Sequence, residues 1–578
     1  MTLAPDAISP DRTFDAIAME IFTNRLLSIT ENMAIHMMRS SFSTQIKERR
    51  DFSVGLFDAC GRLLAQGTHI PLHLGSLIGS TTAVLDRFPL AGMQEGDSFI
   101  CNDPYLGGGT HLPDISIITP IFIDGSVRGF AANIGHHSDI GGSVPGSIAA
   151  MSRTIFEEGI RIPPMRIATR GTINTDLIHM ISANSRLSDE RRLDLNVQIA
   201  VNLRGAEATK NLFLRMCLDK VDQAVDDVLS YTNNRLRRRI GDLRPGRYTY
   251  TTWLDDDGNG GDPLPVTATV IVEANRLHFD FSGTGQQARG ALNVSENALS
   301  ATVYYCVKAL LDPDLMANSG LFEAIMISAP RGSIVNPVFP AACGARSITC
   351  QKVAGAIFGA FRSILSPDRI VASSNDVLPS ISFSGARSGG FYVYGETIGG
   401  GAGARSESDG MDAIHVHVTN SLNLPTEVLE SEFPLLVEEY ALVTDSGGAG
   451  RYRGGLGIAR QVRALEEGTI VSARSDSHKR GADGAVGGLE GGRATLTRNP
   501  GRPDQENLPS KVSRIVLRAG DSVRMETPGG GGFGQPAARS AASLAGDLRD
   551  GIISAEIALR DYGAELTGRA QKHLVTRN

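Results

Sequence analysis

The chain has 578 residues, of which 41% are hydrophobic and 21% are charged, a composition typical of a globular protein. This length predicts about two to four domains with one or more large cores. The formal net charge of −7 argues against nucleic acid or an anionic membrane as the main partner.

The sequence also indicates a cellular compartment. No apolar run approaches the roughly 18 residues needed to cross a bilayer, and the N-terminus lacks the charged-then-apolar pattern of a signal peptide. The six cysteines are scattered without a CxxC pair, which is typical of reduced thiols. We therefore expect a cytoplasmic protein that does not span a membrane.

A long helix is predicted near the N-terminus. Ser9 and Pro10 provide a cap followed by proline in the first turn. Apolar side chains then recur at spacings of three and four residues and form one core-facing stripe: Phe22, Leu26, Ile29, Met33 and Met37. Residues 52–66 follow as a β-hairpin, with two strand-like runs around a turn at 58–61.

A second hairpin is the most informative stretch of the chain. Residues 115–123 form a β-type run, and Asp124-Gly125 is a strong two-residue turn signal. Residues 127–134 form the return strand. Polar segments stand at both open ends of this hairpin.

Further elements alternate between helix and strand. Residues 175–240 are helical in pattern, residues 246–282 are strand-like, and residues 293–311 again indicate a helix. The 65 glycines then cluster between strand-like runs until about residue 534, which predicts tight turns and close backbone approaches. The stretch 537–566 is predicted to be helical.

These elements predict an α+β fold of several layers with mixed and antiparallel sheets. The N-terminal helix and the hairpin site would belong to one region, and a glycine-rich β part would lie toward the C-terminus. The expected divisions are an N-terminal α+β region at 1–245, a central α+β domain at 246–435, a glycine-rich β region at 436–536 and a helical tail at 537–578.

A metal site is predicted where the second hairpin opens. His111 and Asp114 precede the first strand, and His136 ends the second. With the turn centred between residues 124 and 125, position 113 faces His136, so His136 falls between His111 and Asp114. Cross-strand β-carbons lie about 4.5–5.5 Å apart, close enough for these side chains to share an ion.

Two imidazoles and a carboxylate suit Zn²⁺, Mn²⁺ or Fe²⁺. Glycines at 107–109 and 141–142 would let a substrate approach the backbone. The alternative is that histidines and aspartates at loop ends are turn formers and surface groups. The hairpin geometry and the neighbouring His137, Ser138 and Asp139 leave these two interpretations evenly balanced.

Other histidines carry weaker indications. His69 and His73 flank a short apolar segment, where either is a pocket-lining residue or an ordinary loop histidine. His415 and His417 alternate on an apparent strand and so face one side, as a ligand pair or as part of a polar sheet face.

Nucleotide-binding motifs give a negative result. The chain contains no G-x-x-x-x-G-K-[ST] motif. The glycine-rich segments 445–450 and 527–534 would form turns or anion-binding nests, and we favour turns. If the reaction uses ATP, we expect a partner to hold it.

Several segments together resemble the hydantoinase B/oxoprolinase family, whose members include ATP-dependent hydantoinases, 5-oxoprolinases, caprolactamase and the acetone and acetophenone carboxylases. The similarity runs in order over roughly residues 13–536. It is carried by the blocks 48–53, 70–75, 102–114, 136–139, 410–420, 445–455 and 527–534.

The resemblance implies the metal-binding subunit of an ATP-dependent hydrolase of cyclic amides such as hydantoin, 5-oxoproline or a lactam. Four positions match the family's metal ligands: Asp51, His111, Asp114 and His136. One divalent metal, Zn or Mn and alternatively Fe, would bind here, while ATP and Mg would bind to a partner subunit of the hydantoinase A type. We expect a heterotetramer of two subunits of each kind.

The implied mechanism begins with phosphorylation of the amide by the partner, followed by attack of water at the metal. His137 or Asp139 is the candidate proton shuttle, and His73 the candidate substrate contact. Two alternatives remain: a subunit of an ATP-dependent ketone carboxylase, and a non-catalytic scaffold whose metal is structural.

Overall fold

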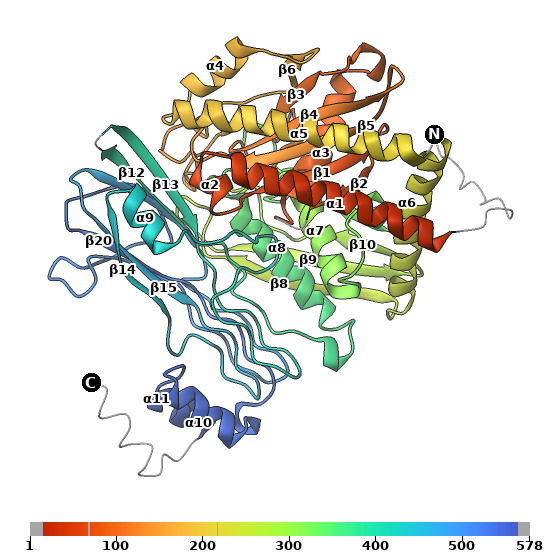
Figure 1. Cartoon of the computed structure of the whole chain (residues 1–578). Coiled ribbons are helices and arrows are strands. Elements are labelled where there is room, and N and C mark those ends of the chain that lie inside the picture. Colours follow the sequence, from red (N-terminus) through yellow and green to blue (C-terminus); the bar gives the residue numbers. More distant parts are fainter. Residues whose placement is uncertain (1–14, 68–69, 217, 388, 564–578) are drawn as a thin grey trace.

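The computed structural model of the chain describes residues 15–67, 70–216, 218–387 and 389–563 (Figure 1). The helix cap predicted at Ser9 and Pro10, and His69, lie outside these residues. Several helices and four antiparallel or mixed sheets make up the described part, so the predicted α+β class is confirmed. Within it, no helix is both long enough and apolar enough to cross a bilayer.

The first sheet contains the two predicted hairpins. Its seven strands are antiparallel and follow the order β2-β1-β5-β4-β3-β6-β7. Their bounds are β1 Phe52–Asp58, β2 Leu63–Gln66, β3 Ser98–Cys101, β4 Asp114–Ile123, β5 Ser126–His136, β6 Met165–Thr169 and β7 Thr172–Ile173. The pairing of β5 with both β1 and β4 places the second hairpin at the centre of the sheet.

Long helices cover one face of this sheet. Helix α1, Ala16–Ser40, starts at the N-cap Asp15 and buries four members of its predicted stripe, while Ile29 is half-buried. Helix α5, Ser188–Met216, runs beside it over β4 and β5 (Figure 1). Helix α3, His73–Arg87, packs against the opposite face. Alternate residues of each central strand therefore face different helices.

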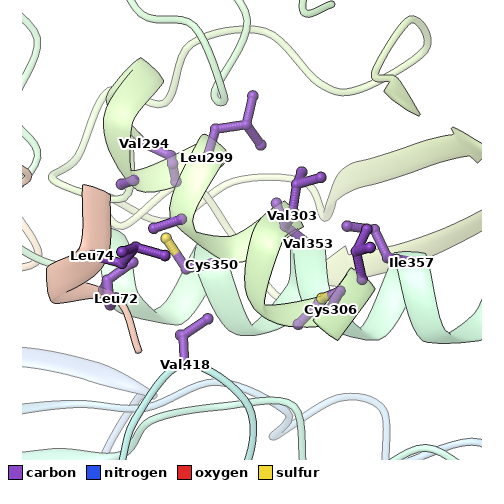
Figure 2. Close-up of a cluster of buried hydrophobic side chains, with 14 of the residues drawn as sticks. Leu72, Leu74, Val294, Leu299, Val303, Cys306, Cys350, Val353, Ile357 and Val418 are labelled. Carbon is purple, nitrogen blue, oxygen red and sulfur yellow. The ribbon is translucent and has the colours of Figure 1, made fainter. Parts of the chain in front are cut away.

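A second layer of sheet lies beyond α3. It has the order β11-β10-β9-β8, with β8 Gly246–Leu254, β9 Leu264–Glu273, β10 Arg276–Asp280 and β11 Ile325–Ser328. Helices α7, Glu296–Leu311, and α8, Arg346–Phe361, fill the space between. Figure 2 shows the apolar core they form, in which Val303 and Val353 meet and Leu72 and Val418 close one end. This core fixes the start of α8 against the first sheet.

The C-terminal part contains two further sheets. One has the order β13-β12-β16-β19, with β12 Ser380–Arg387, β13 Gly390–Thr397, β16 Thr469–Arg474 and β19 Lys511–Leu517. The other has the order β14-β15-β20-β17-β18, with β14 Leu435–Leu442, β15 Ile458–Ala464, β17 Thr495–Arg498, β18 Glu506–Asn507 and β20 Ser522–Glu526. The β13-β12-β16-β19 sheet joins strands from both sides of residue 435. The division of the chain into four regions stays a prediction.

Shorter helices complete the described chain. The α-helices are α2 Thr44–Lys47, α4 Thr175–Ala183, α6 Leu218–Gly241, α9 Thr426–Glu432, α10 Ala541–Arg549 and α11 Ala555–Tyr562. The 3-10 turns are Leu90–Gly92, Ile155–Glu157, Ser319–Leu321, Pro367–Arg369 and Pro536–Ala538. The described part of the stretch 537–566, which the sequence predicts to be helical, contains the two short helices α10 and α11.

The glycine-rich segments pack backbone against backbone, as the predicted close approaches require, and a turn at 444–445 begins the segment 445–450. Residues 527–532 form no turn, contrary to the favoured prediction for this segment, and the N–H groups of 529–532 donate to different neighbouring segments. Gly455 N–H donates to Ala402 O at 2.8 Å, and Gly530 N–H donates to Gly455 O at 2.9 Å. A Cβ at Gly530 would lie 1.9 Å from Ala402 O. Glycine is required here because extended chains pass too close together to admit a side chain.

Candidate metal centre

The predicted metal ligands on the second hairpin meet as a cross-strand pair. Asp114 faces His136 in the β4–β5 ladder, whereas the sequence predicts residue 113 at that position. The difference arises because the register shifts by one residue between Ile121 and Phe122. Such a bulge places two residues of one strand opposite one of the other. It aims the Asp114 carboxylate, rather than Pro113, at His136.

Three side chains converge on one point. His136 Nδ1 lies 2.8 Å from Asp114 Oδ1, and His111 Nε2 lies 2.9 Å from the same oxygen. The two imidazoles stack with ring centroids 5.1 Å apart. All three side chains are buried, and their ligand atoms lie within 4.8 Å of one another. Among the described residues, this is the group of histidines, cysteines and carboxylates with metal-binding geometry.

The His111 ring has a lone pair without a hydrogen-bond partner. Its Nδ1 lies 3.1 Å from the carbonyl oxygen of Gly344, which only accepts, so Nδ1 carries the proton. Nε2 is then an acceptor that faces Asp114 Oδ1, and it has no hydrogen-bond partner in the described structure. Two acceptors this close require a proton or a metal cation between them, and the lowered pKa of His111 disfavours the proton. The donor set therefore fits a divalent cation.

The protonation states also suit metal binding. Burial, followed by the nearby Arg346 cation, lowers the pKa of His111 to about 3. Burial would raise the pKa of Asp114, but His111 and Arg346 outweigh it and hold that pKa well below its ordinary value. The site thus offers a neutral His111 imidazole and an ionised Asp114 carboxylate, the forms that bind metals. Arg346 Nη2 donates to Asp114 Oδ2 at 2.6 Å and fixes its orientation.

Asp51 and His73 lie at the edge of this group. His73 Nε2 is 3.7 Å from Asp51 Oδ1 and 3.7 Å from Asp114 Oδ2. Asp51 O also accepts a hydrogen bond from His136 N–H at 3.0 Å. Both side chains line the same cavity as the three converging residues. Burial lowers the pKa of His73, so its ring is neutral.

His137 and Asp139 point away from the cavity. Because successive strand residues face opposite sides, the His137 ring lies under α5, where Nε2 donates to Gln198 Oε1 at 2.9 Å and Nδ1 meets Arg191. Asp139 accepts hydrogen bonds from Gly141 N–H and from Arg186 Nη1. The structure does not bring these two proposed proton shuttles to the metal ligands.

The predicted His415–His417 pair does not lie on a strand. His417 has a left-handed backbone with φ 54° and contacts Asp376 Oδ1 through Nε2 at 2.8 Å. His415 is half-buried, and its two ring nitrogens are buried without a hydrogen-bond partner in the described structure. The prediction that both face one side of a sheet is wrong, because the turn at 417–418 breaks the alternation.

Three arginines also line this cavity: Arg49, Arg346 and Arg474. Apart from the position of Arg49 two residues before Asp51, nothing in the sequence predicts that they lie there. Arg346 begins α8 and Arg474 ends β16, both far away in the chain. The cavity has a volume of about 70 Å³ and lies between the first sheet, α8 and the β12–β16 sheet. Only the fold brings these cations to the metal ligands.

Comparison with known proteins places this site in a family context. A family model described as hydantoinase B/oxoprolinase matches residues 15–536. The 5-oxoprolinase 1 of Arabidopsis thaliana is 32% identical over 90% of this chain, which spans 42% of that relative. A Pseudomonas protein assigned as the B-type subunit of a D-/L-hydantoinase is 30% identical over 96% of each chain.

Two solved structures share the fold. ATP-dependent caprolactamase from Pseudomonas jessenii has a TM-score of 0.89 at 25% identity, covering 96% of this chain and 98% of that one. Nucleotide-free acetone carboxylase has a TM-score of 0.88 at 18% identity, covering 97% and 83%. The second likeness shows the fold alone.

Proposed function

The chain belongs to the hydantoinase B/oxoprolinase family, and we propose that it is the metal-binding catalytic subunit of an ATP-dependent hydrolase of cyclic amides. The observation that carries this proposal is the unpartnered His111 Nε2, which faces the Asp114 carboxylate inside a buried cavity. The caprolactamase likeness over nearly the whole of both chains supports it.

The reaction needs ATP because an amide is stabilised by resonance and a small opened ring tends to close again. In the proposed sequence the partner transfers the terminal phosphoryl group of ATP to the amide oxygen and releases ADP. Addition of water to the activated carbon and loss of the ring nitrogen as an amine leave an acyl phosphate. A second water hydrolyses this to carboxylate and phosphate.

The residues of this chain prepare the site for the water additions. A bound Zn²⁺, Mn²⁺ or Fe²⁺ would lower the pKa of water toward about 7 and so supply a nucleophile at neutral pH. His111, Asp114 and His136 would hold the ion, with Asp51 completing the set. Gly344 orients His111, and Arg346 orients Asp114.

His73 is the proposed proton-transfer or substrate-contact residue of the cavity. Its Nδ1 lies 3.1 Å from Ser53 Oγ, which fixes the ring, while Nε2 faces the two carboxylates. His137 and Asp139 are less suited to proton transfer, because their side chains are held by other partners.

A separate ATPase chain is part of the proposal. The sequence has no Walker-type phosphate loop, and a relative matched over nearly its full length is assigned as the B-type subunit of a hydantoinase. We propose a partner of the hydantoinase A type that binds ATP and Mg²⁺, in an assembly of two plus two subunits.

The test compares the chain alone with the chain plus its partner. Alone, it should bind one divalent ion and show no turnover of hydantoin, 5-oxoproline or caprolactam. Together, ring opening should require both ATP and the metal. Ring opening by the chain alone without ATP would contradict this division of labour. Incorporation of labelled bicarbonate into product would indicate a ketone carboxylase instead, and full activity without any ion would indicate a scaffold.

A further inference from the structure

Two buried arginines of the metal cavity have no carboxylate partner. Arg49 follows α2, and Arg474 ends β16, yet both line the same cavity as Asp114 and His136. Both side chains are almost fully buried. Among the described residues, neither guanidinium lies within ion-pair distance of an aspartate or glutamate, although other buried arginines do.

Arg49 is held in place by neutral acceptors. Nη1 donates to Gly395 O at 2.8 Å, and Nη2 donates to Thr397 Oγ1 at 2.6 Å. Nη1 also contacts Gln45 Oε1. These bonds orient the guanidinium without neutralising its charge. They give the side chain a fixed direction at the cavity wall.

Arg474 makes fewer hydrogen bonds than Arg49 does. Its Nη1 donates to Gly344 O at 3.1 Å, the same carbonyl that orients His111. Its Nε is buried and has no hydrogen-bond partner in the described structure. Burial, and then the Arg346 cation, lower the pKa of Arg474 to about 9, so it stays protonated at neutral pH.

Two other buried arginines, Arg346 and Arg460, do have carboxylate partners. Arg346 Nη2 pairs with Asp114 at 2.6 Å, and Arg460 Nε pairs with Glu396 at 2.8 Å, so each buried cation has its own anion. An unpaired buried charge is costly, and proteins retain one where a ligand neutralises it. Asp51 and Glu158 act on Arg474 without forming an ion pair with it, and burial raises the pKa of Glu158 to about 8. Arg49 and Arg474 therefore present to the cavity two guanidinium groups that no carboxylate pairs with.

The start of α8 adds a third element. This helix of 16 residues begins at Arg346, and its N-cap Ala345 offers no side-chain cap. Ser347, in its first turn, lines the cavity, and its buried Oγ has no hydrogen-bond partner in the described structure. Helix N-termini favour anions because their N–H groups and the helix dipole point outward.

We propose that Arg49, Arg474 and Ser347 bind the phosphoryl group of the activated substrate. This inference rests on the proposed function and adds to it a defined subsite beside the metal ligands. A phosphate ester dianion matches two guanidinium groups in charge, whereas one bidentate arginine already satisfies a carboxylate. The subsite would orient the reacting carbon toward the metal and retain phosphate until it is released.

The experiment measures binding of inorganic phosphate to the full chain by calorimetry, with and without its metal. The wild type should bind phosphate in both states, and more tightly than acetate. Arg49→Gln and Arg474→Gln should each weaken phosphate binding about tenfold or more, since each removes charge-assisted hydrogen bonds. Arg474→Lys should recover part of the loss because it restores the charge.

Arg204→Gln is the matched control, because Arg204 is exposed on α5. It should bind phosphate like the wild type. Metal content should be unchanged in all variants, and thermal unfolding should verify that each is folded. If the Arg49 and Arg474 variants bind phosphate as tightly as the wild type, or if the wild type binds acetate as tightly as phosphate, the proposed subsite is wrong. Loss of phosphate binding in both variants supports it even if no cyclic amide is hydrolysed, so the two proposals fail separately.

Discussion

His136 Nδ1 lies 2.8 Å from Asp114 Oδ1 because the two residues are direct partners in the β4–β5 ladder. The pairing depends on the bulge beside Ile121, which moves Asp114 into register with His136. Both side chains consequently line the cavity that the starts of α3 and α8 also line, where His111 joins them. A rigid ladder thus holds two ligands of the proposed ion, whereas His111 and Asp51 stand outside the strands.

Removing one of these ligands should remove the ion without unfolding the protein. We expect His136→Gln to lower metal content from one ion per chain to near zero, and activity with the partner by at least about 10²-fold, because an incomplete set of three ligands holds a divalent ion poorly. Elemental analysis of the purified chain measures the first effect. His179→Gln, on the exposed face of α4, should retain both ion and activity.

A structural role for the ion predicts a different pattern. Activity and thermal stability would then fall together in His136→Gln. Full activity in metal-free protein would refute a catalytic ion altogether.

Replacing Asp139 should lower the free energy of unfolding rather than change the chemical step of the reaction. Its carboxylate accepts hydrogen bonds from Gly146 N–H at 3.0 Å and from Arg186 Nη1 at 2.8 Å, and it is fully buried. Asp139→Ala leaves the N–H groups of Gly141 and Gly146 without an acceptor and the partly exposed Arg186 without its anion, so we expect a loss of about 1–3 kcal/mol in the free energy of unfolding. Denaturant titration measures it. Folded Asp139→Ala protein should keep one ion per chain. If Asp139 were a proton shuttle, the variant would instead turn over slowly at unchanged stability.

Much of the N-terminal half can be predicted from local pattern. The stripe of α1, both hairpins and the helices at 175–240 follow from periodicity and turn residues, and so does the approach of His111 and Asp114 to His136. The opposite directions of His136 and His137 also follow from strand alternation, once both are placed at the end of β5. The bulge has no clear local signal, because Val127 and Arg128 are ordinary strand residues.

The arginines and the glycine-rich region depend on contacts between distant segments. Arg474 reaches the metal cavity only because β16 pairs with β12. Glycine clusters indicate close approach of backbones, but they do not distinguish a turn from an extended segment packed against another. That distinction is made by the partner strands, whose positions no local pattern contains.

Gly530→Ala tests the backbone packing of the glycine-rich region. In Gly530→Ala the added Cβ would lie 1.9 Å from Ala402 O, which is backbone and cannot rotate away. We expect a loss of more than about 4 kcal/mol, the range of severe overpacking, or protein that fails to fold. Guanidinium denaturation of the soluble fraction measures it.

Gly546→Ala is the matched control. Gly546 lies inside α10, and the nearest atom to its new Cβ would be Arg549 Nη2 at 3.9 Å. Alanine should stabilise this helix by about 0.5–1 kcal/mol. Equal stability of the two variants would contradict backbone-to-backbone packing at Gly530.

The pH dependence of stability should reveal His415, whose ring nitrogens are buried without a hydrogen-bond partner in the described structure. Burial, and then the Arg49 cation, lower its pKa from 6.5 to about 4. The unfolded chain therefore binds a proton between these values that the folded chain does not. Stability is fully present above about pH 6.5 and falls as the pH drops toward 4. His111 and His73 act in the same direction in metal-free protein.

Replacing His415 isolates its share of this effect. Between pH 7 and pH 4, metal-free wild type should lose about 3 kcal/mol more unfolding free energy than His415→Leu, since each unit of pKa shift corresponds to about 1.4 kcal/mol. Urea titrations in the presence of a chelator, at several pH values, measure both slopes. His179→Leu should follow the wild-type slope because that ring is exposed. Identical slopes for wild type and His415→Leu would mean that His415 is hydrated and titrates normally.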